Sequence, residues 1–506
     1  MELHNLTLRV GQSEKDLLAV CERKLRAPCA DFRILRKSLD ARDKSNIKWV
    51  YSVECSDKPL KKSERIFPQI KGGAPRVYIA GAGPAGLFCA LRLIEYGIRP
   101  VLFERGKRVE ERRADVEKFR KEGVLDPESN VQFGEGGAGT FSDGKLNTQT
   151  HGGYNRDVIE LFLRFGAPEE IGYLSKPHIG SDRLFSIIRN IRAHLLDAGA
   201  EIRFGGKLTD VTVKDGKLCA VEGNGVREDA DALVLAIGHS ARDTFEMLFR
   251  RGLAMEQKEF AVGVRIEHLQ AEIGKAQYGR LYTKLPAAEY KLVSHASERA
   301  AYTFCMCPGG SVIASASEEG GLVVNGMSDY ARDGLNANSA LAAQVKKSDF
   351  ASDHPLAGVA FQRKIERAAY AAAGGGYRAP VQLAGDFLAG KESTRFASVL
   401  PTYAPATAFA PVSAYLPAEL CDTLKTALTD MDRRLKGFAC PDAVLTGVET
   451  RTSSPVRILR GDDLQASAAG VYPCGEGCGY AGGITSAAAD GLRVADAIAQ
   501  KYLRGQ

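Results

Sequence analysis

The chain has 506 residues, of which 44% are hydrophobic and 26% are charged, as in an ordinary folded globular protein. No apolar run approaches the roughly 20 residues needed to cross a bilayer, and the first residues do not resemble a secretory signal, so we expect a cytoplasmic protein with no membrane partner. The 11 cysteines follow no regular spacing, which argues against a disulfide framework. Because the length exceeds what one compact core usually serves, we expect two or three domains.

The net charge of +6 is unevenly distributed. Residues 1–71 hold 16 Lys and Arg against 10 Asp and Glu, so this segment carries the whole excess. A basic segment can contact RNA or an acidic partner, but most such segments are only solvated surface, and we take that interpretation. Alternation over residues 6–10, a helical repeat over 17–25 and an apolar run at 47–53 predict a small α+β domain. The polar residues 58–71 predict a linker.

A glycine-rich turn follows this linker. Residues 77–80 form an apolar run typical of a buried parallel strand, and a helix and a strand at 101–103 complete a βαβ unit. In the turn, Gly-Ala-Gly-Pro-Ala-Gly, the first glycine permits the tight bend, the second admits a pyrophosphate and the third lets the helix pack closely. The helix N-terminus then faces the phosphates. The predicted nucleotide-binding residues are Gly81, Gly83, Pro84, Ala85 and Gly86, with Glu104 and Arg105 at the adenosine ribose.

A second glycine-rich string near the carboxyl terminus favours FAD over NAD. Residues 470–477 predict a strand that runs into a glycine turn, and residues 482–487 begin a helix of small side chains. A second site so far along the chain suits an extended cofactor, with Glu476 at the ribityl hydroxyls and the helix N-terminus near the flavin ring. The predicted cofactor-binding residues of this string are Gly475, Glu476, Gly482, Gly483, Ile484 and Thr485.

These patterns predict an α/β fold. A discontinuous Rossmann-like FAD-binding domain covers residues 75–255 and 441–506, and a mixed α+β substrate domain at 256–440 is inserted between its two parts. Residues 181–199 are expected to form a helix that Ser181 caps. Because the inserted domain holds no second dinucleotide fingerprint, we expect NAD(P)H to bind only transiently, as an electron donor.

Several longer strings are distinctive: residues 133–146, 238–243, 263–268, 392–394, 449–455 and 472–485. Together they resemble a bacterial family of uncharacterised FAD-dependent dehydrogenases, within the wider group of p-hydroxybenzoate hydroxylase-type flavoproteins. The resemblance covers nearly the whole chain and implies an FAD-dependent oxidoreductase whose substrate is unsettled. It also implies further residues along the flavin, namely Gly136, Gly137, Ala138, Gly139, Thr140, Val211 and Gly238.

Four residues are candidates for catalysis. Arg265, Arg451 and Arg457 lie in strings that the resemblance places near the cofactor, where they can bind a carboxylate or phosphate, or alternatively FAD or a neighbouring carboxylate. His268, at the end of an apparent strand, is a candidate proton donor, against the interpretation that it is a structural histidine bonded to the backbone.

Two cysteine pairs need an interpretation. Cys474 and Cys478 flank the predicted flavin, but their spacing is not that of the usual redox pairs, so we predict a packing role. Cys305 and Cys307 face one side of a predicted strand, and no further ligand completes a set, so we predict no metal site.

The sequence therefore predicts an FAD-dependent oxidoreductase that transfers a hydride between the flavin and a small organic substrate. The three arginines lead us to expect an anionic substrate. Two alternatives stay open: a flavoprotein that acts on RNA through its basic amino-terminal domain, and a flavin-binding module without turnover. The oligomeric state stays undetermined.

Overall fold

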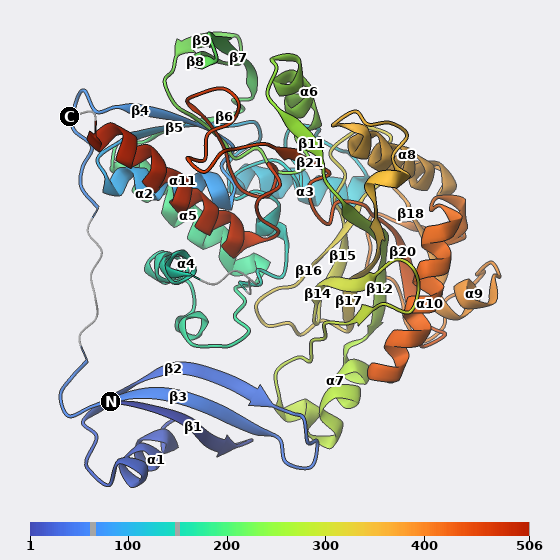
Figure 1. The fold of residues 1–506 in the computed structure, drawn as a ribbon. Coiled ribbons are helices and arrows are strands. Elements are labelled where there is room, and N and C mark those ends of the chain that lie inside the picture. The colour runs from blue at the N-terminus through green and yellow to red at the C-terminus, as the bar shows by residue number, and fades with distance from the viewer. Residues whose placement is uncertain (61–66, 147–151, 505–506) are drawn as a thin grey trace.

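The computed structural model describes residues 1–60, 67–146 and 152–504, so residues 61–66 of the predicted linker lie outside the described part. Figure 1 shows a small amino-terminal sheet beneath a larger body. In that body, a parallel sheet with its helices lies beside an antiparallel sheet that has helices of its own.

The amino-terminal sheet is antiparallel, with strand order β1-β3-β2. Its elements are β1 (Glu2–Arg9), α1 (Asp16–Leu25), β2 (Asp31–Asp40) and β3 (Lys48–Ser56). Leu6, Leu17 and Val53 are buried in its own small core, because alternate strand residues and one helix face are apolar. The sheet meets the body at Lys37, whose backbone N–H donates to the carbonyl of Tyr173 at 2.8 Å.

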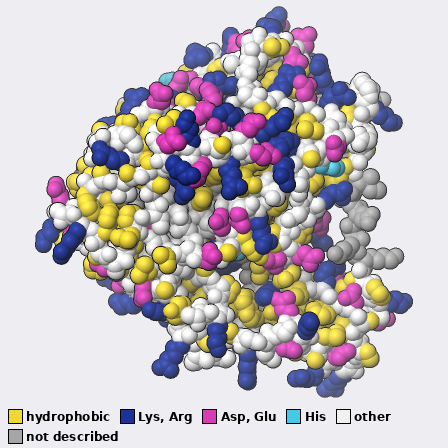
Figure 2. Space-filling model, turned by 180° about the vertical axis from the view of Figure 1, so that it is seen from behind, with side chains coloured by type: hydrophobic (Ala, Val, Ile, Leu, Met, Phe, Trp, Pro, Cys, Tyr) yellow, Lys and Arg dark blue, Asp and Glu magenta, His cyan; other side chains and the backbone are white. Residues whose placement is uncertain are grey.

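The basic residues of this sheet are partly matched by acidic ones. Arg33 Nε lies 3.1 Å from Glu54 Oε2, and Lys37 pairs with Glu14. Figure 2 shows Lys and Arg side chains interspersed with Asp and Glu over the face it displays. The excess positive charge is therefore spread among acidic groups.

The parallel sheet contains the glycine-rich turn, and its strand order is β22-β10-β4-β5-β6. The strands are β4 (Arg76–Ala80), β5 (Arg99–Glu104), β6 (Glu201–Phe204), β10 (Leu233–Leu235) and β22 (Val471–Pro473). All neighbouring pairs are parallel, and the residues of β4, β5, β10 and β22 are almost completely buried, as expected for a sheet covered on both faces, whereas the edge strand β6 is partly exposed. The carboxyl-terminal strand β22 pairs with β10, so the two glycine-rich strings meet in one sheet.

Helices cover one face of this sheet: α2 (Pro84–Glu95), α4 (Gly153–Arg164), α5 (Ser181–Asp197) and α11 (Ile484–Arg504). The other face packs on a meander and a helix: β7 (Leu208–Lys214), β8 (Lys217–Gly223), β9 (Val226–Asp229) and α6 (Arg242–Arg250). Helix α5 begins where predicted, but the expectation that Ser181 caps it is wrong. Gly180 is the N-cap residue, and the Ser181 hydroxyl donates to Asp329 at 2.8 Å.

The larger sheet has strand order β13-β14-β17-β12-β20-β18-β19, and only its β18–β19 pair is parallel. The strands are β12 (Phe260–Leu269), β13 (Val293–Ser294), β14 (Ala301–Cys307), β17 (Asn336–Val345), β18 (Ala379–Leu383), β19 (Thr407–Phe409) and β20 (Val444–Glu449). Helices α8 (Ala357–Ala372) and α10 (Ala418–Arg434) contribute to its apolar core.

The remaining elements connect these parts. They are β11 (Met255–Gln257) paired with β21 (Val456–Ile458), the hairpin β15 (Ser311–Ala314) and β16 (Val324–Met327), α3 (Val109–Glu122), α7 (Gln270–Tyr278), α9 (Ala384–Ala389) and the 3-10 turns Ala138–Phe141, Glu169–Gly172, Gly279–Lys284, Lys347–Asp349 and Val412–Ala414. Within the described residues, no helix has the length and apolar character that a bilayer crossing requires.

Candidate functional site

The turn between β4 and α2 is shaped by close backbone contacts. Gly81 has a φ of 106°, and a Cβ there would lie 2.2 Å from the carbonyl oxygen of Ala236. A Cβ on Gly86 would lie 1.9 Å from the carbonyl oxygen of Gly81, which explains the third glycine as a packing requirement. Gly83 is the N-cap residue of α2 and provides no side-chain cap, so the first turn of the helix can receive a phosphate.

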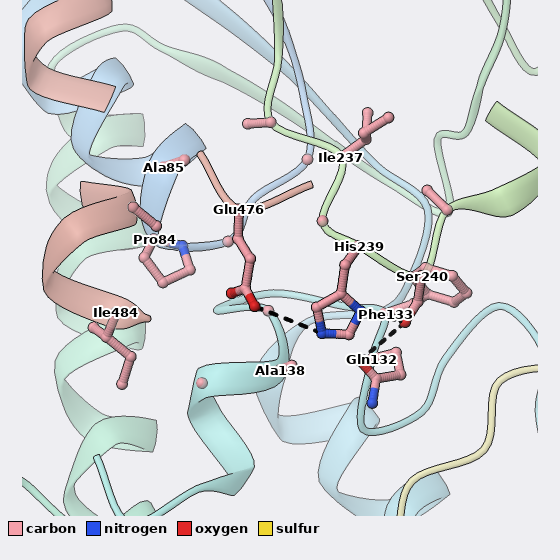
Figure 3. Close-up of a pocket in the computed structure, with 18 of the residues that line it drawn as sticks. Pro84, Ala85, Gln132, Phe133, Ala138, Ile237, His239, Ser240, Glu476 and Ile484 are labelled. Atoms are coloured by element: carbon pink, nitrogen blue, oxygen red, sulfur yellow. Dashed lines mark hydrogen bonds and ion pairs between the residues drawn. The ribbon is translucent and has the colours of Figure 1, made fainter. Parts of the chain in front are cut away.

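This turn opens into a cavity of about 330 Å³, which reaches from the parallel sheet to the antiparallel sheet. Figure 3 shows part of its wall, with Pro84 and Ala85 on one side and His239 and Gln132 on the other. The predicted residues that line the cavity are Gly81, Gly83, Pro84, Ala85, Glu104, Arg105, Gly137, Ala138, Gly139, Gly238, Arg451, Glu476, Gly482, Gly483 and Ile484. The structure thus brings both glycine-rich strings and the 137–139 turn to one site.

Six predicted cofactor residues are not part of this lining: Gly86, Gly136, Thr140, Val211, Gly475 and Thr485. Several of them lie behind the residues that line the cavity. A Cβ on Gly136 would lie 2.2 Å from Thr140 Oγ1, and Val211 is buried beneath the opposite face of the sheet. Thr485 Oγ1 donates to the carbonyl of Leu146 at 2.8 Å. Glycine and small-residue strings identify a site, but they do not show which residue faces the ligand.

Glu104 has a second role besides the predicted ribose contact. Its carboxylate accepts hydrogen bonds from the backbone N–H groups of Ala82 at 2.8 Å, Gly106 at 2.9 Å and Gly134 at 3.0 Å. Because a carboxylate can accept about four hydrogen bonds, capacity remains on the side that lines the cavity. Glu104 therefore ties the glycine turn, the end of β5 and the 134 loop together.

Glu476 presents an acceptor to the cavity. Among the described residues, no protein donor lies within hydrogen-bonding distance of its carboxyl group, and its closest titratable neighbour is His239, with Nε2 4.0 Å from Oε1 (Figure 3). Burial raises the pKa of Glu476 to about 7, while the charge of Lys258 opposes the shift. A half-buried acceptor with no hydrogen-bond donor from the described residues suits a hydroxyl-rich ligand chain, so the residues present fit the ribityl part of FAD.

His239 and Ser240 form a polar network that the motifs did not reveal. Ser240 Oγ lies 2.9 Å from His239 Nδ1 and 3.2 Å from Gln132 Oε1, and it accepts a hydrogen bond from Arg451 Nη1 at 2.9 Å. Gln132 Nε2 donates to Ser315 Oγ at 2.6 Å, which orients the amide so that its oxygen faces Ser240.

The count of hydrogens in this network assigns the histidine tautomer. Ser240 has one hydroxyl hydrogen, and Gln132 Oε1 needs it. His239 Nδ1 must then carry a hydrogen toward Ser240, which leaves Nε2 as a bare acceptor toward Glu476. Burial, with the charges of Arg451 and Arg242, lowers the pKa of His239 to about 3, so the ring is neutral at pH 7.

Of the three arginines expected to hold an anionic substrate, only Arg451 lines the cavity. Its guanidinium already binds Glu366 at 3.1 Å and Ser317 at 2.5 Å, in addition to Ser240. Arg265 is completely buried and donates to the carbonyl of Cys305 at 2.9 Å.

Arg457 lies at the surface, 3.4 Å from Glu256. The basis for an anionic substrate is therefore lost, because these guanidinium groups are used by the protein itself.

His268 does not reach the cavity either. It is 3% exposed in the antiparallel sheet, and its Nε2 lies 2.8 Å from the carbonyl oxygen of Phe438. Burial lowers the pKa of His268 to about 4. The structure therefore favours the alternative interpretation, a neutral structural histidine, over a proton donor.

Glu449 lines the far end of the cavity and was not among the sequence candidates. It is 3% exposed, and Arg265 Nη1 lies 3.4 Å from its Oε2. Burial raises the pKa of Glu449 to about 7, against the charge of Arg265. Its carboxyl group can therefore exchange a proton near neutral pH. In the sequence, Glu449 belongs to the distinctive residues 449–455, but nothing there singles it out. Its role depends on its burial, which the local sequence does not show.

The cationic groups at the cavity wall are paired. Arg105 and Lys207 bind Glu128 and Asp243, with Arg105 Nε 2.7 Å from Glu128 Oε2. Lys145 Nζ lies 2.8 Å from Asp143 Oδ2 and donates to a backbone carbonyl at 2.6 Å. The carboxyl groups of Glu476 and Glu449 are less well compensated, so the cavity does not favour an added negative charge.

Residues 259–452 match the family model described as FAD-dependent protein, C-terminal domain-like, and residues 2–56 match a domain of unknown function. An uncharacterised protein of Clostridium beijerinckii is 47% identical over 491 residues, which cover 93% of this chain and 92% of the relative.

Solved structures give distant likenesses. CtdE in complex with FAD is 11% identical, with a TM-score of 0.35 over 85% of this chain and 91% of that chain. The flavin-dependent brominase Bmp2 is 13% identical, with a TM-score of 0.38 over 85% of this chain and 79% of that chain. On the strength of the full-length relative and the carboxyl-terminal match, the chain belongs to the family of the Clostridium beijerinckii protein, and FAD is its cofactor.

Proposed function

We propose that this chain is an FAD-dependent oxidoreductase of the dehydrogenase type, related to the p-hydroxybenzoate hydroxylase group, which transfers a hydride between flavin and a small organic substrate. The observation that carries the proposal is that one cavity extends from the two glycine-rich strings to Glu449. When bound, FAD supplies a ring that accepts or releases a hydride. The chain supplies the walls, the orientation and a proton.

Several residues are suited to hold FAD. The turn at Gly81 and Gly83 with the first turn of α2 would hold the pyrophosphate, and Glu104 would accept from the adenosine ribose. Glu476 would accept hydrogen bonds from the ribityl chain, beside the neutral His239. In each assignment, a polar group of FAD would meet a hydrogen-bond donor or acceptor of the cavity wall.

Glu449 is the proposed acid and base. A hydride transfer to or from an alcohol, amine or alkene also moves a proton, and a group with a pKa of about 7 gives or takes it at neutral pH. Because the cations around the cavity are already paired, we revise the expected substrate from an anion to an uncharged molecule. NAD(P)H, if it is the electron donor, would share this cavity transiently, since the sequence of residues 256–440 has no second dinucleotide fingerprint.

The experiment is stopped-flow reduction of the purified FAD-loaded protein by NADH and NADPH, with panels of uncharged and carboxylate compounds as competitors. We expect uncharged compounds to compete and to reoxidise the flavin. Glu449→Gln should slow turnover about 100-fold and remove the pH dependence near 7, whereas the exposed Glu272→Gln should leave turnover unchanged. Turnover by Glu449→Gln at the wild-type rate would refute its role, and competition by carboxylates alone would refute the charge argument.

A further inference from the structure

Two thiols lie at the cavity wall near Glu449. Cys305 lines the cavity and is partly exposed, and Cys307, two residues further along β14, is completely buried. Both are free thiols. Cys307 Sγ donates a hydrogen bond to the carbonyl oxygen of Cys305 at 3.3 Å, so the two residues are in direct contact.

The backbone of β14 is distorted where Cys305 lies. Phe304 pairs with Ala340 of β17, and the next pair is Cys307 with Asn338, so β14 has one residue more than its partner between these points. Cys305 also has a φ of 45°, in the left-handed region that residues other than glycine seldom adopt. Bulges and such strained residues occur often at functional sites, because they redirect a side chain. Here the distortion accompanies the exposure of Cys305 to the cavity.

A buried cation lies against the two cysteines. Arg265 Nη2 lies 2.9 Å from the carbonyl oxygen of Cys305 and 3.6 Å from Cys307 Sγ. A hydrogen bond from Cys305 lowers the pKa of Cys307, burial opposes this shift, and the charge of Arg265 supports it. The interaction with Cys307, together with burial, raises the pKa of Cys305, so Cys307 is the sulfur whose thiolate form is the better stabilised of the two. Cations beside a thiol stabilise the reactive thiolate in this way.

We propose that Cys305 and Cys307 form a redox-active dithiol that exchanges with a small organic disulfide entering the cavity. This activity goes beyond the proposed hydride transfer and needs no contribution from it. The exposed Cys305 makes the first attack, and the buried Cys307 resolves the mixed disulfide. The oxidant is the disulfide substrate itself.

The exchange balances in two steps. The Cys305 sulfur attacks the disulfide RSSR, which forms a Cys305–SR bond and breaks the bond between the ligand sulfurs. The leaving RS⁻ takes the proton that Cys305 loses. The Cys307 sulfur then attacks the Cys305 sulfur, closes the Cys305–Cys307 bond and releases the second RS⁻. Two electrons pass from the protein sulfurs to the ligand.

Oxidised glutathione and mass spectrometry test the proposal on the reduced, FAD-loaded protein. The tryptic peptide 300–332 contains only these two cysteines. We expect this peptide to lose two hydrogen atoms in the wild type, to gain one glutathione on Cys305 in Cys307→Ser, and to stay unmodified in Cys305→Ser. The partly exposed Cys219 of the same chain serves as the reference thiol in the same digest.

The control variant Cys474→Ser/Cys478→Ser should behave as the wild type, because both of its cysteines are buried at another wall. If the peptide keeps both thiols while Cys219 takes up glutathione, Cys305 and Cys307 do not form a redox-active dithiol. If glutathione remains on Cys305 in the wild type, Cys307 does not resolve it, and the proposal fails. Neither readout depends on flavin reduction, so failure of this proposal can be distinguished from failure of the proposed hydride transfer.

Discussion

Replacing Glu366 with glutamine should destabilise the protein strongly. Glu366 of α8 is 1% exposed and binds two arginines: Arg242 at 2.8 and 2.9 Å, and Arg451 at 3.1 Å from each carboxylate oxygen. It also accepts a hydrogen bond from Thr450 at 2.7 Å. Burial by itself would raise the pKa of Glu366, but the two arginine charges outweigh it and hold the pKa well below the usual range.

The magnitude follows from what the substitution leaves behind. Arg242 keeps an ion pair with Glu318, but Arg451 loses the one carboxylate that pairs with it among the described residues, and it stays buried. Removal of one partner from a buried ion pair costs about 3–5 kcal/mol of unfolding free energy. Because the folded pKa of Glu366 is depressed, its contribution is present above the unfolded pKa of about 4.3 and is lost as the pH falls toward the folded pKa. The difference between wild type and Glu366→Gln should therefore begin to shrink below about pH 4.3 and should be smaller at pH 4 than at pH 7.

The assay is urea unfolding followed by circular dichroism at pH 7 and at pH 4. Tryptophan fluorescence would report only the amino-terminal sheet, because Trp49 is the single tryptophan. The matched control is Glu246→Gln, whose 41% exposed side chain pairs with Arg363 at the surface and should change stability by less than about 1 kcal/mol. If Glu366→Gln differs from wild type by no more than this control at pH 7, the buried network does not stabilise the fold as argued.

Three further predictions concern the cavity. Glu104→Gln should weaken FAD binding by about 1.5–3 kcal/mol, because its amide cannot accept from both Ala82 and the 134 loop; unchanged affinity in an apoprotein titration with FAD would contradict this. Between about pH 4.3 and 7, the unfolding free energy of the wild type should fall by about 3 kcal/mol relative to that of Glu449→Gln. The reason is that a carboxyl group whose pKa is raised by folding destabilises the folded state as the pH rises. Parallel curves of unfolding free energy against pH for the two proteins would exclude a raised pKa. Cys474→Ser/Cys478→Ser should keep normal flavin reduction, because burial raises both pKa values and leaves unreactive thiols; loss of substrate turnover with intact flavin reduction would reveal a redox pair.

The glycine turn and the surrounding βαβ unit could be predicted because their requirements are local. Gly81 needs a positive φ, and Gly86 needs the absence of a Cβ, and both needs are visible as residue types at fixed spacing. In the amino-terminal sheet, β1, α1 and β3 also lie close to where alternation, helical periodicity and an apolar run predict them. Patterns of this kind depend on neighbours a few residues away, so the sequence alone is sufficient.

The roles of individual side chains were decided by tertiary structure. Arg451 is an available cation in the sequence, but Glu366, 85 positions away, occupies it. His239 faces Glu476 only because two distant loops meet at the cavity. Glu449 acquires its raised pKa from burial, and Cys305 faces the cavity where β14 gains one residue against β17. Charge pairing, burial and strand register are set by contacts between remote segments, and no local pattern encodes them.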